Sequence, residues 1–186
     1  MLCTNLSEYF DWIVFPLWNE LPLELTDLKV GIIGLGVSGG MIADALKFMG
    51  SDVSYYSRTR KLEKEQQGIQ YKEFHQLLKE SQVVFACLNK NVILLNDEEF
   101  KQLGNKKILF NTSIGPASDS EALKNWLNCK DNYYCCDTEG AIGDNAKELI
   151  NYPNVLCAKK SAGMTKQAYG LFKLKKFWII SRLIYQ

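Results

Sequence analysis

The amino-acid sequence predicts a single α/β domain, built as a doubly wound parallel sheet with flanking helices. Two patterns indicate this fold. Short apolar runs typical of buried strands alternate with amphipathic or polar segments along almost the whole chain. The first of these runs leads directly into a glycine-rich turn and a stretch with helical spacing. The size agrees with one domain, because the chain has 186 residues, of which 47% are hydrophobic and 23% charged.

The N-terminal third of the chain is expected to form a helix, a strand, a second helix and a second strand. Residues 5–20 carry apolar positions at helical spacing. The run KVGIIG at 29–34 is rich in β-branched residues and ends in glycine, which is typical of a buried parallel strand. The following helix should span 37–49, because Gly50 is a good residue to terminate it. The run DVSYYS predicts the second strand at 52–57.

The middle of the chain alternates in the same way. Residues 58–68 are polar and charged, which favours a loop or an exposed helix. Residues 71–81 have the periodicity of an amphipathic helix. Apolar runs at 82–88 and 106–113 predict two more strands.

Two helices are expected on either side of the last of these strands, over 96–104 and 118–128. Each begins with short polar side chains that can accept hydrogen bonds from first-turn amides. The candidate caps are Asn96 or Asp97 for the first helix and Ser118 or Ser120 for the second.

Strands at 132–137 and 154–158 and a final helix complete the pattern. We therefore divide the chain into an N-terminal helix and linker (1–28), the sheet domain (29–165) and a C-terminal tail (166–186). The tail is basic and very apolar, and it is expected to dock on the sheet or on a dimer partner. The alternatives are contact with a membrane and a disordered or aberrant terminus.

The turn after the first strand has the pattern G-x-G-x-x-G. Its residues are Gly34, Leu35, Gly36, Val37, Ser38 and Gly39. The first glycine permits the tight turn, the second lets a pyrophosphate approach the backbone, and the third lets the helix pack against the strand. The helix N-terminus adds unpaired amides and a positive dipole end. In this strand–turn–helix context the motif predicts a dinucleotide-binding Rossmann domain. The alternative is a fold that keeps its glycines for packing only.

The end of the second strand bears on which coenzyme is bound. An NAD-binding domain usually has an acidic residue there, which binds the ribose 2′-hydroxyl. Here the strand ends in Ser57, followed by Arg58, Thr59 and Arg60, whereas Asp52 lies at the opposite end. A hydroxyl and two guanidinium groups suit a 2′-phosphate better than a diol. The sequence thus predicts NADP(H) as the preferred coenzyme, with NAD(H) possible. The alternative is a solvated loop.

Composition argues against several other classes of protein. The formal net charge is +1, so neither nucleic acid nor an anionic membrane is expected as a partner. No apolar run is long enough for an ordinary membrane helix. The chain has one histidine and six cysteines with no C-x-x-C pair, so no metal site is expected. Reduced thiols in a cytoplasmic protein are the simplest interpretation.

Several segments, in order, carry a family resemblance. They are VGIIGLGVSGGMIADALKFMG, SQVVFACLNKN, FNTSIG, CCDTEG and YPNVLCAKKSAGMT. Over residues 5–168 the chain resembles the coenzyme-binding domain of the D-isomer-specific 2-hydroxyacid dehydrogenases. The resemblance implies an oxidoreductase that transfers a hydride between a nicotinamide coenzyme and a small 2-hydroxy or 2-keto acid, in a homodimer. It also implies that the N-terminal substrate lobe of that family is largely missing here.

The resemblance places three catalytic residues, and this chain differs at each. Ile114 stands where the family has a substrate-binding arginine, and Lys160 stands where it has the acid–base histidine. Ile142 holds the place of the glutamate, although Glu139 is near. Lys160 could act as a cation or a proton donor, or it could be an ordinary surface lysine. The single histidine, His75, is expected to be a half-exposed helix residue.

The coenzyme contacts implied by the resemblance are better preserved. Leu88 and Asn89 stand where the family has the end of its fourth strand. Thr112 and Ser113 match the segment that passes under the nicotinamide, and Asp137 matches the residue that binds the carboxamide. Three functions remain open. The chain is an oxidoreductase, a degenerate domain that binds the coenzyme and serves assembly, or an interaction protein without a ligand.

Overall fold

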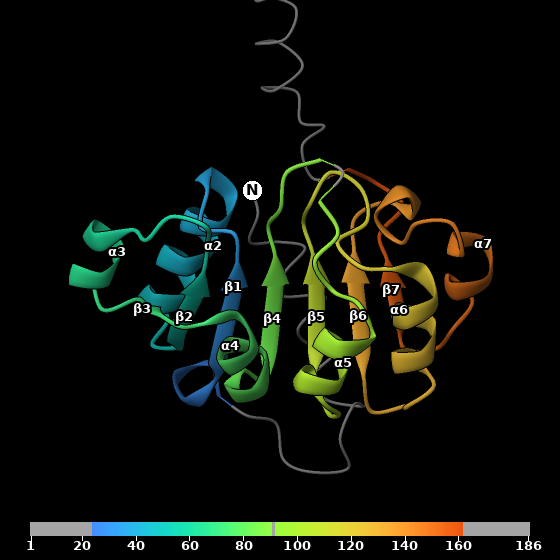
Figure 1. Ribbon diagram of the computed structural model, residues 1–186, viewed down its shortest axis with the longest axis horizontal. Coiled ribbons are helices and arrows are strands. Elements are labelled where there is room, and N and C mark those ends of the chain that lie inside the picture. The colour runs from blue at the N-terminus through green and yellow to red at the C-terminus, as the bar shows by residue number, and fades with distance from the viewer. Residues whose placement is uncertain (1–23, 91, 162–186) are drawn as a thin grey trace, which may run out of the picture.

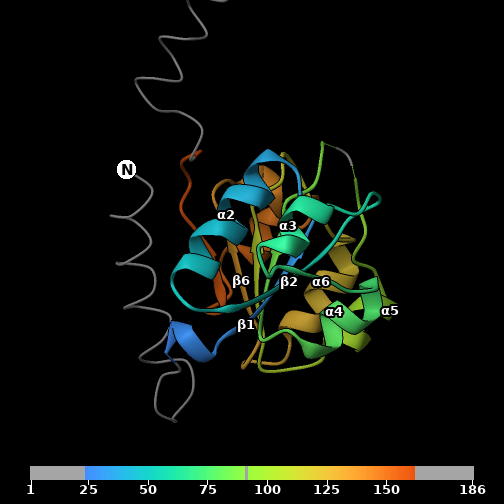
Figure 2. The same ribbon diagram turned by 90° about the vertical axis from the view of Figure 1, so that its left-hand side faces the viewer.

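The computed structural model describes residues 24–90 and 92–161. The helix expected at 5–20 and the final helix lie outside these described residues. Within them the chain forms a parallel sheet covered by helices on both faces (Figures 1 and 2). The predicted doubly wound α/β fold is therefore confirmed.

The sheet has seven strands in the order β3-β2-β1-β4-β5-β6-β7, and every pairing is parallel. The strands are β1 (Lys29–Ile33), β2 (Asp52–Tyr56), β3 (Gln70–Tyr71), β4 (Val83–Ala86), β5 (Ile108–Asn111), β6 (Tyr133–Cys136) and β7 (Val155–Cys157). Six of them fall inside the predicted strands. Strand β1 lies inside the sheet, and β2 and β3 follow on one side of it. The chain then crosses to the other side of β1, where β4 to β7 follow in order. The direction in which strands are added therefore reverses between β1 and β4.

Strand β3 was not predicted, and the helix expected over 71–81 begins later than expected. Gln70 and Tyr71 pair with Ser54 and Tyr55 of β2, and the helix starts only at Phe74. A pair of strand residues carries no periodicity of its own. Its conformation comes from hydrogen bonds to a neighbouring strand, which the local sequence does not show.

The helices are α2 (Val37–Phe48), α3 (Leu62–Gln66), α4 (Phe74–Glu80), α5 (Asp97–Leu103), α6 (Ser120–Leu127) and α7 (Ala146–Leu149), with 3-10 turns η1 (Leu25–Asp27) and η2 (Glu139–Ala141). Helix α2 lies on one face of the sheet, and α4, α5 and α6 lie on the other (Figure 2). Each face has its own apolar core: Val30, Ile32 and Tyr55 point to the side of α2, and Ile33 and Val84 point to the other side.

Helix caps show how local polar groups fix the ends of these elements. Asn96 is the N-cap of α5 in a capping box, and its backbone N–H donates to Glu99 Oε2 at 3.0 Å. The cap of α6 is Asp119, so the prediction of Ser118 or Ser120 was wrong. Ser118 is held in a bridge to Leu95, and Ser120 lies inside the helix, where its Oγ accepts from the Asp144 N–H.

In the two described stretches of chain, no helix is both long and apolar enough to cross a lipid bilayer.

Candidate functional site

The residues singled out from the sequence follow the carboxyl ends of the strands. Because all strands are parallel, these ends lie along one edge of the sheet, at the arrowheads in Figure 1. The glycine turn follows β1, residues 57–60 follow β2, and 88–89 follow β4. Thr112 and Ser113 follow β5, and Asp137 follows β6. The fold thus gathers them at the edge where open α/β sheets bind ligands.

The three glycines of the turn have different structural needs. Gly34 has φ +93°, and a Cβ there would lie 2.6 Å from Cys87 O. A Cβ on Gly39 would overlap Gly34 O, so the helix can approach the strand only with glycine. Gly36 differs: its φ is −83°, and a Cβ there would meet no atom within 4 Å. Packing explains Gly34 and Gly39, whereas Gly36 leaves a space open in front of the turn.

The N-terminus of α2 faces that space with the chemistry of an anion site. Gly36 is its N-cap and supplies no side-chain hydrogen bond, and no acidic residue occupies the first turn. The first amides of a helix have no partner within it, and its dipole is positive at this end. Leu35 is buried beneath the turn, and Val37 and Ser38 are exposed. The turn can therefore hold a pyrophosphate on backbone amides.

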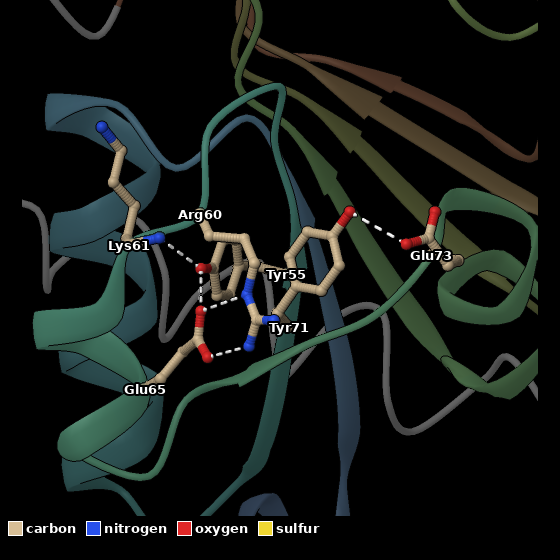
Figure 3. A network of polar contacts seen from close by, with 6 residues as sticks. All are labelled: Tyr55, Arg60, Lys61, Glu65, Tyr71 and Glu73. Atoms are coloured by element: carbon tan, nitrogen blue, oxygen red, sulfur yellow. Dashed lines mark hydrogen bonds and ion pairs between the residues drawn. The ribbon is translucent and has the colours of Figure 1, made fainter.

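The loop after β2 is more constrained than its sequence suggests. Ser57 Oγ donates to Thr59 O at 2.6 Å, and Arg58 and Thr59 are exposed. Arg60 turns away from the loop tip and binds Glu65 of α3 through two N–H groups (Figure 3). The hydrogen bond to Arg60 holds the pKa of the Glu65 carboxyl below its usual value. Sequence reasoning missed Glu65, because only the fold brings its carboxylate to Arg60.

The ends of β4 and β5 are tied together by hydroxyl groups. Ser113 Oγ accepts from the Leu88 N–H at 2.9 Å and donates to Ala86 O at 3.2 Å. Thr112 Oγ1 donates to the same Ala86 O at 3.1 Å. Ser113 is buried, whereas Thr112 and Asn89 are exposed. These bonds fix the backbone of both loops beside the glycine turn.

Asn111 is a residue that the sequence analysis missed. Its Nδ2 donates to Gly115 O and Ala141 O, each at 3.0 Å, and its Oδ1 accepts from the Ser113 N–H at 2.9 Å. Tyr134 OH also donates to Ala141 O, at 2.6 Å, and burial raises the pKa of its phenol. A buried amide thus fixes the loop after β5 and the η2 turn. Its signal was a polar residue ending an apolar strand.

The three positions implied to be catalytic hold side chains of different character. Ile114 is 72% exposed, and Ile142 is fully buried in the apolar core on the side of α4 to α6. Glu139 opens η2 and is exposed. Lys160 is exposed after β7, and its backbone N–H donates to Asp137 O at 2.9 Å. Because Ile142 belongs to the core, only Glu139 offers a carboxylate in this turn.

The single histidine and the cysteines are the remaining residues that the sequence analysis considered. His75 Nε2 lies 3.4 Å from Glu99 Oε1, between α4 and α5. The cysteines at 87, 129, 135, 136 and 157 are free thiols. Among the described residues, no group of three or more His, Cys, Asp or Glu side chains could hold a metal ion.

Comparison with known proteins gives consistent results. The family model described as D-isomer specific 2-hydroxyacid dehydrogenase, NAD binding domain, matches residues 2–159. A glyoxylate reductase of Thermococcus litoralis is 39% identical over 113 residues, which are 57% of this chain and 34% of that protein. A D-specific alpha-keto acid dehydrogenase of Enterococcus faecium is 27% identical over 162 residues, which are 77% of this chain and 49% of that protein. The chain thus spans between a third and a half of the length of these curated relatives.

Solved structures show the same fold. D-lactate dehydrogenase from Aquifex aeolicus, complexed with NAD and lactic acid, superposes with a TM-score of 0.79 at 20% identity. The match covers 97% of this chain and 61% of that one. The apo-structure of the D-lactate dehydrogenase from Escherichia coli gives 0.78 at 24% identity, covering 97% and 60%.

Proposed function

The chain belongs to the D-isomer specific 2-hydroxyacid dehydrogenase family and matches its NAD-binding domain. From that premise we propose that it binds a nicotinamide dinucleotide and is part of an oxidoreductase that acts on 2-hydroxy or 2-keto acids. The observation that carries this proposal is the open space at Gly36. It lies before helix amides that have no partner within α2, and packing gives no reason for a glycine there.

The residues along the sheet edge fit such a coenzyme. Backbone amides from Leu35 to Gly39 would hold the pyrophosphate. The loops fixed by Ser113 and Thr112 would lie under the nicotinamide, with Leu88 and Asn89 at their side, and Asp137 would bind the carboxamide. The bound coenzyme would supply the hydride, and the chain would bind and orient it.

We propose NADP(H) as the preferred coenzyme, with NAD(H) as an alternative. Residues 57–61, SRTRK, contain no carboxylate to bind a ribose diol. Ser57, Arg58 and Thr59 lie at the end of β2, and Arg58 is exposed to solvent. A 2′-phosphate dianion gains charge-assisted hydrogen bonds from such a loop. Arg60 belongs to the same loop, but Glu65 binds it.

Chemistry on the substrate needs a cation for the carboxylate and a proton donor for the carbonyl. Lys160 is the candidate for both tasks, because it follows β7 at the same edge. The other two catalytic positions argue against turnover, because neither holds a polar side chain. Ile114 is exposed, and Ile142 lies in the core. This favours a second candidate function, a domain that binds the coenzyme and serves assembly without turnover.

We propose a homodimer as the assembled form, located in the cytoplasm. Val37, Met41 and Phe48 lie on one side of α2 and are exposed, and an apolar stripe of this kind is stabilised when a partner covers it. Sedimentation velocity tests the dimer. Free thiols at all five described cysteines fit a reducing compartment.

Fluorescence titration of the purified chain with NADPH and NADH tests the central proposal. We expect both to bind, with NADPH tighter, and binding of neither would refute coenzyme binding. A panel of 2-keto acids then tests turnover. If turnover is seen, Lys160→Ala should abolish it. The control is Lys159→Ala, which changes the adjacent exposed lysine and should leave turnover unchanged. Binding without turnover would support the second candidate.

A further inference from the structure

Arg60 lies in the loop that follows β2, and a network of polar contacts holds it near the outer edge of the sheet (Figure 3). Its Nε donates to Glu65 Oε1 at 3.0 Å, and its Nη2 bonds to Glu65 Oε2. The guanidinium also lies over the Tyr71 ring, with Cζ 4.9 Å from the ring centroid. Glu65 therefore pairs with the charge of Arg60, and the Tyr71 ring packs against the flat face of its guanidinium group.

Glu65 is itself fixed from a second side. Tyr55 OH donates to Glu65 Oε1 at 2.8 Å, and the same hydroxyl accepts from the Lys61 N–H at 2.6 Å. The Tyr55 side chain is buried, so its hydroxyl is a rigid support. The Glu65 side chain is 19% exposed, against 58% for Arg60. The carboxylate is thus the sheltered and well-oriented member of the pair.

This arrangement makes Glu65 a competitor of a phosphate. An arginine fork binds carboxylates and phosphates through the same pairs of N–H groups. Two of the five guanidinium N–H donors already bond to Glu65, and the carboxylate cancels the positive charge that would attract a 2′-phosphate. Arg58, which is also exposed, is then the arginine of this loop that Glu65 does not engage.

We propose that Glu65 is a positioning residue that sets the coenzyme preference, by withholding Arg60 from the 2′-phosphate of NADP(H). This proposal rests on the proposed function, because it assigns a role within the same coenzyme site. Its consequence is an NADP(H) preference weaker than two arginines would give, with NAD(H) tolerated.

The variant Glu65→Gln tests the proposal. Glutamine keeps one oxygen that can accept from Tyr55 OH and Arg60 Nε, and it removes both the charge and the second oxygen, which accepts from Arg60 Nη2. We expect the affinity for NADPH to rise about five- to tenfold at low salt while that for NADH changes less than about twofold. The gain should shrink as salt screens the charges. The matched control is Glu63→Gln, which removes an exposed charge from the same helix and should alter the NADPH-to-NADH affinity ratio less than about twofold.

The variant Arg60→Gln completes a double-mutant cycle and separates this role from a structural one. Alone it should weaken NADPH binding less than about threefold, and in combination it should remove the gain from Glu65→Gln. An equal shift for both coenzymes, a gain that persists without Arg60, or a tenfold loss in Arg60→Gln alone would each overturn the proposal. Arg60→Gln alone decides the matter if Glu65→Gln does not fold. If the unaltered chain binds neither coenzyme, the proposed function falls and this proposal falls with it.

Discussion

At the scale of the residue, the glycine turn shows that one motif serves two purposes. Gly34 and Gly39 satisfy steric demands of the fold, because any Cβ there would press on a backbone carbonyl oxygen. Gly36 has an ordinary φ and open space beside it. A side chain at Gly36 would fill the space that a pyrophosphate needs and would leave the fold intact. Substitution of Gly34 or Gly39 should therefore lower the stability of the fold, whereas substitution of Gly36 should weaken coenzyme binding.

The pair Gly36→Ala and Gly39→Ala tests this separation. Gly39→Ala should lower the free energy of unfolding by about 1–3 kcal/mol, because its Cβ meets Gly34 O. Gly36→Ala should change it by less than about 1 kcal/mol. Coenzyme affinity should nevertheless fall about tenfold or more in Gly36→Ala, because the methyl group keeps the pyrophosphate from the amides. Urea unfolding and NADPH titration measure the two effects, and a stable Gly36→Ala variant with unchanged affinity would contradict the assignment.

At the scale of the element, the α6 cap shows how neighbouring polar residues divide their roles. Asp119 accepts from the Glu121 and Ala122 N–H groups at 3.0 Å each. Ser118 is buried beside Leu95, and among the described residues no hydrogen-bond partner reaches its Oγ. Sequence pattern alone ranks both as good caps. Only the direction in which the chain enters the helix separates them.

Asp119→Ala should therefore lower the stability, whereas Ser118→Ala should not. Losing the Asp119 cap should cost about 1 kcal/mol of stability, because two first-turn amides lose their acceptor. Ser118→Ala removes a buried hydroxyl without a partner, so stability should stay within about 0.5 kcal/mol of the original or rise. Chemical denaturation of both variants measures the difference. Equal losses would show that Ser118 shares the capping role.

At the scale of the whole molecule, a sheet buried on both faces places thiols in its interior. Cys135 lies in the core on the side of α2, and Cys136 lies in the core on the other side. Burial raises the pKa of both thiols, because a thiolate loses its hydration in an apolar interior. In the unfolded chain a cysteine thiol ionises near pH 8.5. The folded state then holds protons that the unfolded state releases.

The fold should accordingly lose stability in alkali. The contribution of each buried thiol is complete below about pH 8.5 and declines above it, by up to about 2 kcal/mol between pH 8 and 10. Urea unfolding at a series of pH values in reducing buffer measures this slope. Cys135→Ala should have a shallower slope than Cys129→Ala, whose thiol is only half-buried. Identical slopes would show that Cys135 ionisation does not contribute.

Much of this molecule follows from local sequence. Apolar runs predicted six of the strands, and the glycine turn together with Gly50 predicted the long helix α2. The positions of the glycine turn and of Thr112, Ser113 and Asp137 at strand ends followed from the order of the elements. These features are local because hydrophobic periodicity and backbone preferences act over a few neighbouring residues.

The contacts between distant segments were decided only by the tertiary structure. Strand β3 exists because β2 provides its hydrogen bonds. Asn111 can hold the η2 turn because the fold brings Ala141 to its amide group. The order of the elements placed Arg60 in the loop after β2, but the fold decided its partner, because Arg60 and Tyr55 of β2 both bind Glu65 of α3. Such partners depend on distance in space, which local preferences do not encode.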